Sequence, residues 1–402
     1  MAYVFAGLFL LSAPEASTET AVTTDDQFFA VEPSEVEEEP PGADGRRPLR
    51  VRGEFGRGVE FSTPSDSFAV QLRARAQLQA RSRHGVEDDL GFFVRRMRLL
   101  FGGHAKNRRL SYYIQLGFSE RDLETDRPVP LRDAFATAHL SKAFNLRIGQ
   151  MKVPFDRQRV MSSSKLQLVE RSDVVNELNL DRDAGIQVYG DLFGNYLRYH
   201  LGVFGGEGRN RFNPDFGLLY ATRLRFFLTG AFDDGVESDL ARERRLRVAV
   251  SAAAGFNHKT RRTRSTQGAF LGGDYDALHG AMDLVAKYAG LSFTAQALVR
   301  ESRRLSDAAR ASLDALSLPA STRGAFAQVG YLTPYALEIV GRFGALDPYG
   351  ESAEDQPRAI EATGGLSWYV IDHDLKVQGT YTLNRSGGAD THVARVQTQV
   401  FF

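Results

Sequence analysis

The chain has 402 residues, with 50 Lys and Arg against 50 Asp and Glu, and it contains no Cys. Without Cys it forms neither disulfides nor thiolate metal sites, and it has no Cys nucleophile. Residues 1–45 hold ten acids and no base, which leaves 50 bases against 40 acids, a net charge of +10, in residues 46–402. Arginine supplies 43 of these bases, and a guanidinium keeps its charge and binds oxyanions with paired hydrogen bonds.

The amino terminus has the pattern of an exported protein. Residues 3–13 (YVFAGLFLLSA) have the length of a signal-peptide hydrophobic region, and Ala13 and Ala16 have the spacing of a cleavage site. Residues 17–50 combine acids with Pro and few large apolar groups, so we expect a disordered linker. The predicted organisation is a signal peptide (1–16), an acidic linker (17–50) and a barrel (51–402). The alternative is a frayed cytoplasmic N-terminus or a mis-chosen start.

From residue 68 onward, apolar and polar residues alternate with period two. In 68–81 the even positions are apolar and the odd positions carry Arg and Gln. This pattern predicts a strand with one apolar and one polar face. We find sixteen such segments: 68–81, 92–104, 110–118, 133–141, 146–153, 184–192, 196–204, 218–229, 245–256, 278–288, 291–300, 324–332, 337–343, 360–370, 375–383 and 393–402.

The connections between these segments alternate between longer and shorter, with 230–244 as the one long member of the short set. An even number of strands with short turns on one rim and longer loops on the other is typical of outer-membrane β-barrels. A secreted β-sandwich or solenoid also alternates. The barrel is favoured because aromatic residues end the apolar faces and because the chain stops on an alternating strand. The fold class is therefore an all-β, transmembrane antiparallel barrel of about 16 strands.

Arg95 interrupts the apolar side of the second segment. Two interpretations remain open at this stage. The side chain lies near the outer end of the strand and meets lipopolysaccharide phosphate, or the strand contains a bulge that turns it elsewhere.

Several motifs resemble those of one known family. They are 93–99 (FVRRMRL), 131–135 (LRDAF), 146–155 (LRIGQMKVPF), 170–172 (ERS), 182–188 (RDAGIQV) and 202–208 (GVFGGEG). Together these resemble the phosphate-selective porin O and P family of Gram-negative outer membranes. The resemblance implies a sixteen-stranded, homotrimeric barrel in the outer membrane, whose third external loop folds into the lumen and whose arginine ladder guides anions.

We find no pattern that indicates catalysis, so no catalytic residue, metal or cofactor is expected. The eight His never fall at metal-site spacing, and there is neither a G-x-S-x-G nor a G-K dipeptide. Asp372, His373 and Asp374 are explained by a polar turn. We expect no nucleic-acid partner.

The arginines of the polar face are the candidate site. Rings of Arg or Lys in a pore concentrate anions and repel cations. The alternative is that they pair with Asp283, Glu338 and Glu361 and brace the barrel. Those predicted to form the anion pathway are Arg73, Arg75, Arg96, Arg98, Arg198, Arg223, Arg225, Arg245 and Arg247.

The long connection 154–183 is the predicted constriction. Ser163 or Ser164 can cap a short helical turn, and an inward fold would bury the apolar side that Leu166, Leu168 and Val169 give it. The alternative is a surface loop whose bases bind lipopolysaccharide. The bases placed at the narrowest part of the pore are Arg157, Arg159, Lys165 and Arg171.

The sequence thus predicts a passive porin that prefers small anions, with outer-membrane lipid and lipopolysaccharide as its surroundings. The rival hypothesis is a structural or adhesive barrel with an occluded lumen.

Overall fold

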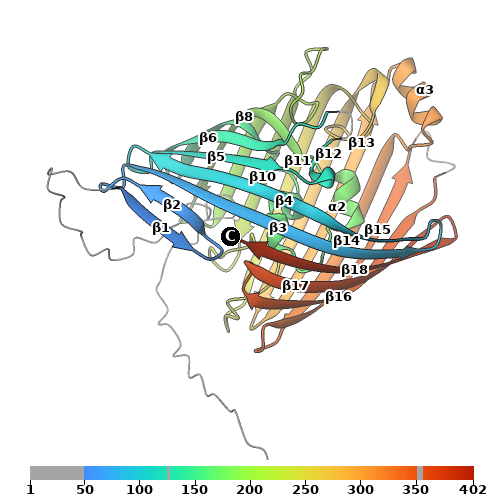
Figure 1. The fold of residues 1–402 in the computed structure, drawn as a ribbon. Helices are drawn as coiled ribbons and strands as arrows, with labels where there is room; N and C mark the ends of the chain where they lie inside the picture. Colours follow the sequence, from blue (N-terminus) through green and yellow to red (C-terminus); the bar gives the residue numbers. More distant parts are fainter. Residues whose placement is uncertain (1–48, 125–126, 351–355) are drawn as a thin grey trace, which may run out of the picture.

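The computed structural model describes residues 49–124, 127–350 and 356–402. The predicted sixteen-stranded antiparallel barrel is confirmed, and Figure 1 shows the strands following one another around the ring in chain order. They are β3 (Phe68–His84), β4 (Asp89–Ala105), β5 (Leu110–Gly117), β6 (Leu131–Ser141), β7 (Phe144–Lys152), β8 (Arg182–Leu192), β9 (Leu197–Phe204), β10 (Leu219–Phe227), β11 (Arg247–Arg262), β12 (Phe270–Tyr288), β13 (Leu291–Arg303), β14 (Ser321–Leu332), β15 (Leu337–Tyr349), β16 (Ala359–Ile371), β17 (Leu375–Ser386) and β18 (Ala389–Phe401).

The barrel closes between its first and last strands. β18 pairs with the second half of β3, from His392 opposite His84 to Phe401 opposite Arg75. Phe402 then exchanges two backbone hydrogen bonds with Ala74, at 2.9 and 3.1 Å. No strand edge of the ring is left open at this seam.

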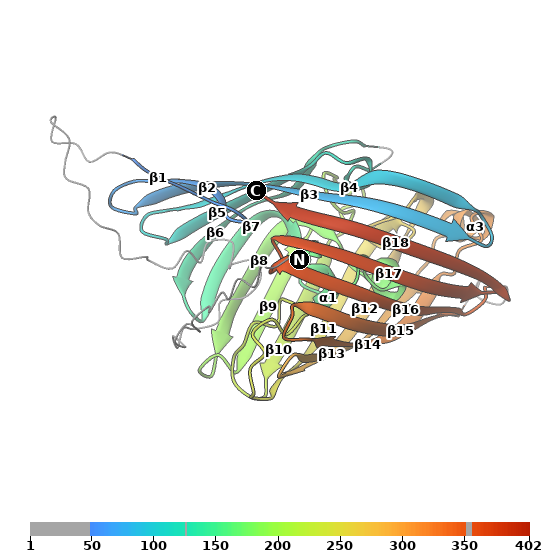
Figure 2. The ribbon, with the colours of Figure 1, turned by 60° about the horizontal axis from the view of Figure 1, so that its bottom comes forward.

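A hairpin of β1 (Arg50–Glu54) and β2 (Gly58–Ser62) precedes the ring and was not predicted. β2 pairs with the first residues of β3, from Val59 opposite Leu72 to Ser62 opposite Ala69. It therefore occupies the part of the β3 edge that β18 does not reach. Figure 2 shows this hairpin at the same end of the barrel as the C-terminus. Residues 1–48 lie outside the described residues, so the signal peptide and the acidic linker remain predictions.

The two faces of the strands differ in the way that the alternation predicts. Large apolar side chains on one face are exposed, such as Phe92 (85%), Met282 (67%) and Phe343 (58%). Polar side chains of the other parity are buried, including Gln77, Arg223 and Gln399. A barrel in a membrane has its apolar face toward lipid and its polar face toward the lumen.

The exception at Arg95 is a bulge. The register between β3 and β4 shifts where Gln77 pairs with Arg96 and Leu78 pairs with Val94, which leaves residue 95 without a partner. The freed side chain binds the carboxylate of Glu170 through two hydrogen bonds of 2.5 and 3.0 Å. Of the two interpretations of Arg95, the bulge is right and the lipopolysaccharide contact is wrong.

Several strands extend beyond the predicted segments, above all β11 and β12, whose connection shrinks to 263–269. The alternation breaks down there because hairpin ends outside the lipid have no apolar face to present. The connection between β10 and β11 remains long, as predicted.

The helical segments lie in the connections. None of those in the described residues is long and apolar enough to cross a membrane. α3 packs on β12, where Leu313 and Ala309 join Leu271 and Tyr275 in a small apolar cluster. The segments are η2 (Glu120–Asp122), α1 (Arg157–Val160), η3 (Ser163–Lys165), α2 (Asp173–Leu178) and α3 (Asp307–Ala315).

The closing seam yields a first prediction. Deleting Phe402 removes two backbone hydrogen bonds, each with a net contribution of about 1 kcal/mol, from the only strand pair that joins the two ends of the ring. We expect a smaller fraction of heat-modifiable, folded protein on cold SDS gels. Phe402→Tyr keeps both bonds and the terminal aromatic ring and is the control. Equal folded fractions for the deletion and the control would contradict the prediction.

Candidate functional site: a basic lumenal cavity

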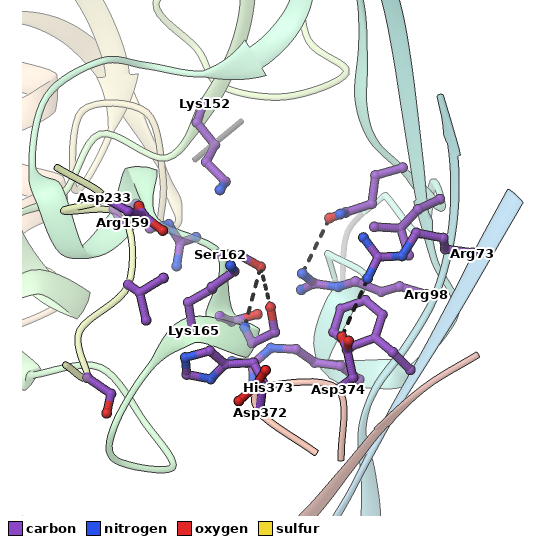
Figure 3. A pocket seen from close by; sticks show the side chains of 18 of the residues that line it. Arg73, Arg98, Lys152, Arg159, Ser162, Lys165, Asp233, Asp372, His373 and Asp374 are labelled. Carbon is purple, nitrogen blue, oxygen red and sulfur yellow. Dashed lines mark hydrogen bonds and ion pairs between the residues drawn. The ribbon is translucent and has the colours of Figure 1, made fainter. Parts of the chain in front are cut away.

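A cavity of about 590 Å³ lies along the inner wall formed by β3 to β8 and is bounded by connections from both rims. Fourteen basic and seven acidic side chains line it, so its wall carries an excess of positive charge. In Figure 3, Lys152, Arg159 and Lys165 lie across the cavity from Arg73 and Arg98. The bases are Arg57, Arg73, Arg95, Arg96, Arg98, Arg121, Arg132, Lys152, Arg159, Lys165, Arg171, Arg182, Arg247 and Lys287, and the acids are Asp122, Asp133, Asp233, Asp239, Glu243, Asp372 and Asp374.

The structure separates the predicted wall arginines into two groups. Arg73, Arg96, Arg98 and Arg247 line the cavity. The others lie away from it, and most of these are buried in hydrogen bonds and ion pairs. This second group consists of Arg75, Arg198, Arg223, Arg225 and Arg245.

Ion pairing explains three members of the second group, namely Arg198, Arg223 and Arg225. Arg223 binds Asp283 at 2.6 Å and Arg225 binds Asp234 at 2.9 Å, all buried. Arg342 pairs in the same way with Glu361 at 2.5 Å. Removing one member of such a pair leaves an uncompensated buried charge. For these arginines the bracing interpretation of the sequence applies.

The connection between β7 and β8 lies against the polar face of the strands. Its carbonyl oxygens and hydroxyls accept hydrogen bonds from wall side chains: Arg75 donates to Ser162 and Ser163, and Lys376 donates to Leu166. Ser162, one residue before the expected cap, accepts from the backbone N–H of Ser164. Leu166, Leu168 and Val169 are each 1% exposed.

Three of the four bases predicted on this connection reach the cavity, namely Arg159, Lys165 and Arg171. Arg157 does not, because its guanidinium donates to the carbonyl oxygens of Asp234 and Val236 in another connection. Arg157 therefore links the β7–β8 connection to the connection between β10 and β11.

The residues of the 146–155 motif hold this region together. Gly149 has φ +128°, and a Cβ there would overlap the carbonyl oxygen of Ala134 on the neighbouring strand, so only glycine fits without strain. Gln150 donates to the carbonyl oxygen of Arg132 at 3.0 Å, and Lys152 donates to that of Val160 at 2.5 Å. Phe155, near the start of the connection, is fully buried.

Seven bases of the cavity were missed from the sequence: Arg57, Arg95, Arg121, Arg132, Lys152, Arg182 and Lys287. Arg132 and Arg182 have the parity of the lipid-facing side. A register shift between β5 and β6 leaves Arg132 without a partner on β5, and Arg182 is the first residue of β8, where it turns to Asp133 at 2.9 Å. Arg121 belongs to a connection, where the alternation of a strand does not apply and cannot predict which way a side chain points. Lys152 is the last residue of its strand, two residues before Pro154. For Arg132 and Arg182, the adjacent Asp in the R-D motifs was the available signal.

Two carboxylates organise the bases beside β4. Asp122 binds Arg98 at 2.5 Å and Arg132 at 3.2 Å, and Glu170 binds Arg95. Burial alone would raise the pKa of Glu170, but Arg95 and Arg96 lower it more, so the pKa is held below its usual range. Both carboxylates stay ionised and keep the guanidinium groups in place.

Two cavity cations are not neutralised in this way. Arg121 stacks over Phe93 with 4.4 Å between its guanidinium carbon and the ring centroid. Neither Arg121 nor Lys165 forms an ion pair with any residue in the part of the chain that the structure describes. Their charges are available to a passing ion.

The family model for "phosphate-selective porin O and P" matches residues 68–402, which is most of the chain. The chain belongs to this family. An uncharacterized protein of Aquifex aeolicus (strain VF5) is 24% identical over 331 residues, which cover 71% of this porin and 73% of the relative.

Solved structures share the fold of this porin. An anion-selective porin from Comamonas acidovorans superposes with a TM-score of 0.55 at 11% identity, covering 83% of this porin and 100% of that chain. The outer membrane channel DcaP of Acinetobacter baumannii superposes with a TM-score of 0.56 at 12% identity, covering 85% of this porin and 99% of that chain. A loop-deletion mutant of OmpT of Vibrio cholerae superposes with a TM-score of 0.57 at 10% identity, covering 84% of this porin and 100% of that chain. The protein is a porin of the outer membrane of a Gram-negative bacterium, as predicted.

Three carboxyl groups outside the strands titrate near neutral pH. Burial raises the pKa of Asp156 to about 6 and that of Glu207 to about 7. Burial, and then the neighbouring charge of Glu361, raise the pKa of Asp173 to about 6. All three are ionised at pH 8 and protonated at pH 5, so acidification removes negative charge from the β7–β8 and β9–β10 connections.

We therefore expect the anion-to-cation permeability ratio, taken from reversal potentials in a KCl gradient, to rise as the pH falls from 8 to 5. A variant with Asp156→Asn, Asp173→Asn and Glu207→Gln mimics the protonated forms, and Asn retains the helix-capping ability of Asp156. It should have the low-pH ratio throughout. A variant ratio that changes with pH as much as that of the wild type would rule these groups out.

Proposed function

We propose that this porin is a passive diffusion channel that prefers small anions, including phosphate and other oxyanions. The observation that carries the proposal is the excess of bases over acids around the lumenal cavity. Field lines concentrate in a narrow cleft with walls of low dielectric, so such an excess raises the local concentration of anions and lowers that of cations.

The available charges fit oxyanions in particular. The guanidinium groups of Arg73 and Arg98 lie on one side of the cavity and the ammonium group of Lys165 lies on the other, and Arg121 also belongs to the lining. Planar guanidinium groups match the oxygens of phosphate and carboxylate. Since ion pairs with Asp122 and Asp374 moderate the attraction, a bound anion can leave again, which conduction requires.

We also propose that the β7–β8 connection is the inward-folded third external loop and narrows the pore. Its hydrogen bonds to Arg75, Arg223 and Lys376 support this, because those side chains belong to the polar faces of three strands around the ring. Arg159, Lys165 and Arg171 then form its filter. A homotrimer surrounded by lipid and lipopolysaccharide completes the proposal. One structural neighbour, OmpT of Vibrio cholerae, is described in a trimer form.

An occluded barrel with a structural or adhesive role is the second candidate. The observation that favours it is a dry apolar cluster between α2 and the strands that face it, in which Val174, Val175 and Leu178 contact Leu298 and Phe326. This packing fills part of the lumen. Single-channel recording in planar bilayers separates the two: steps of anion-selective current support the porin, and a silent, folded barrel supports the occluded form.

Replacing the two available cations tests the anion preference. We expect Arg121→Gln with Lys165→Gln to lower the anion-to-cation permeability ratio about threefold or more. A unit charge 5 Å from an ion contributes roughly 0.8 kcal/mol even at the dielectric constant of water. Neither side chain braces the barrel, so the folded fraction should not change. The matched control is Arg245→Gln with Lys259→Gln, which removes the same charge away from the cavity. Equal ratios for both variants would contradict the proposal.

Shortening the β7–β8 connection tests the constriction. Deleting residues 162–175 removes η3 and part of α2, and we expect a larger conductance and weaker discrimination between chloride and phosphate. Heat-modifiable mobility must show that the variant is folded. A folded deletion variant with the conductance of the wild type would exclude this loop as the constriction.

A further inference from the structure

The connection between β10 and β11, residues 228–246, does not behave as a turn on the short rim. Outer-membrane barrels carry short turns on the periplasmic side, and the neighbouring connections 193–196 and 289–290 follow that rule. In 228–246, by contrast, Asp234, Glu237 and Ser238 are each 1% exposed. A turn in water would not bury these polar groups.

This connection, which we call the rim insert, is joined to the β7–β8 loop by a dense set of hydrogen bonds. Arg157 donates to the carbonyl oxygens of Asp234 at 2.6 and 3.0 Å and of Val236 at 3.1 Å. The carboxylate of Glu237 accepts from the Gln158 side chain and from the backbone N–H of Gln167, both at 2.8 Å. The backbone N–H of Glu237 donates to the carbonyl oxygen of Lys165.

The rim insert is also fixed to the barrel wall. Asp234 pairs with Arg225 of β10, and Lys287 of β12 donates to the carbonyl oxygens of Asp233 and Ser238. Gln328 of β14 donates to Glu237 at 3.1 Å. The insert therefore has contacts with several strands as well as with the loop.

One side of the rim insert borders the basic cavity. Phe232, Asp233, Val236, Ser238, Asp239 and Glu243 belong to its lining, together with Arg159, Lys165 and Arg171 of the β7–β8 loop. The two segments meet beside the same open space, and their contact surfaces are buried.

We propose that the rim insert is the second half of the constriction, so that the pore is narrowed from both rims, and that Glu237 and Arg157 are positioning residues that hold the two halves together. This inference rests on the proposed pore. In this proposal the insert determines the width of the pore. The carboxylate of Glu237 keeps that width constant, because Glu237 joins the loop, the insert and the wall at one point.

Replacing residues 231–241 by a short Gly-Ser turn is the direct test. We expect the single-channel conductance to rise about twofold or more, since the insert is one wall of the narrow part, and discrimination between chloride and phosphate to fall. If the conductance of the folded variant is unchanged while wild type and variant both stay anion-selective, the inference fails and the proposed function remains. If conductance rises but neither protein selects anions, the anion preference fails and the insert remains a constriction.

A point variant tests the positioning role without shortening the chain. Glu237→Gln removes one charge and places an amide N–H among three N–H donors, so we expect frequent conductance sublevels and excess open-channel noise. Glu237→Asp keeps the carboxylate and should restore part of the quiet current. The matched control is Glu243→Gln, which loses the same charge in the same insert, where Glu243 pairs only with the near-surface Arg247 among the described residues. Equal current noise in Glu237→Gln and Glu243→Gln would overturn the positioning role.

Discussion

The structure depends on one constraint, which is that no backbone polar group can remain unpaired in the hydrocarbon of a membrane. A sheet meets this constraint only when its first and last strands pair. Here β18 and β3 do so from His392 to Phe401, and Phe402 completes the pairing at Ala74. Once the ring is closed, alternation places apolar side chains toward lipid and polar side chains toward the interior, and every later feature follows from how that interior is filled.

A sixteen-stranded ring is too wide for its own side chains to fill. Segments inserted into it bring backbone carbonyl groups that need donors. The wall supplies them: Arg223 donates to Phe155, Lys376 to Leu166, and Gln378 to Leu166 and Gln167. The interior bases thus have two roles. Arg75, Arg223 and Lys376 hold the inserted chain, and other bases along β3 to β8 line open space.

The strands could be predicted from the sequence because period-two alternation is a local property, and all sixteen predicted segments fall on strands. The role of a given interior arginine could not be predicted, because that role depends on partners far away in the chain. Arg223 and Arg73 have the same parity, yet Asp283 neutralises the first and the second lines the cavity. Parity also fails at Arg95 and Arg132, where a register shift inserts one residue, and at Arg182, where a strand begins. The unusual length of 230–244 was visible, but nothing local indicated that it turns inward.

The β1–β2 hairpin has a consequence for the order of assembly. Closing the ring joins residues very distant in sequence, since Gln77 and Gln399 are 322 positions apart, and such non-local pairing forms slowly. The β2–β3 pairing is local and is available as soon as β3 exists. It covers Ala69 to Leu72 early, so that β3 waits for its distant partner with a shorter exposed edge. The hairpin thereby shortens the length of β3 that is open to pairing with a second, unfinished chain.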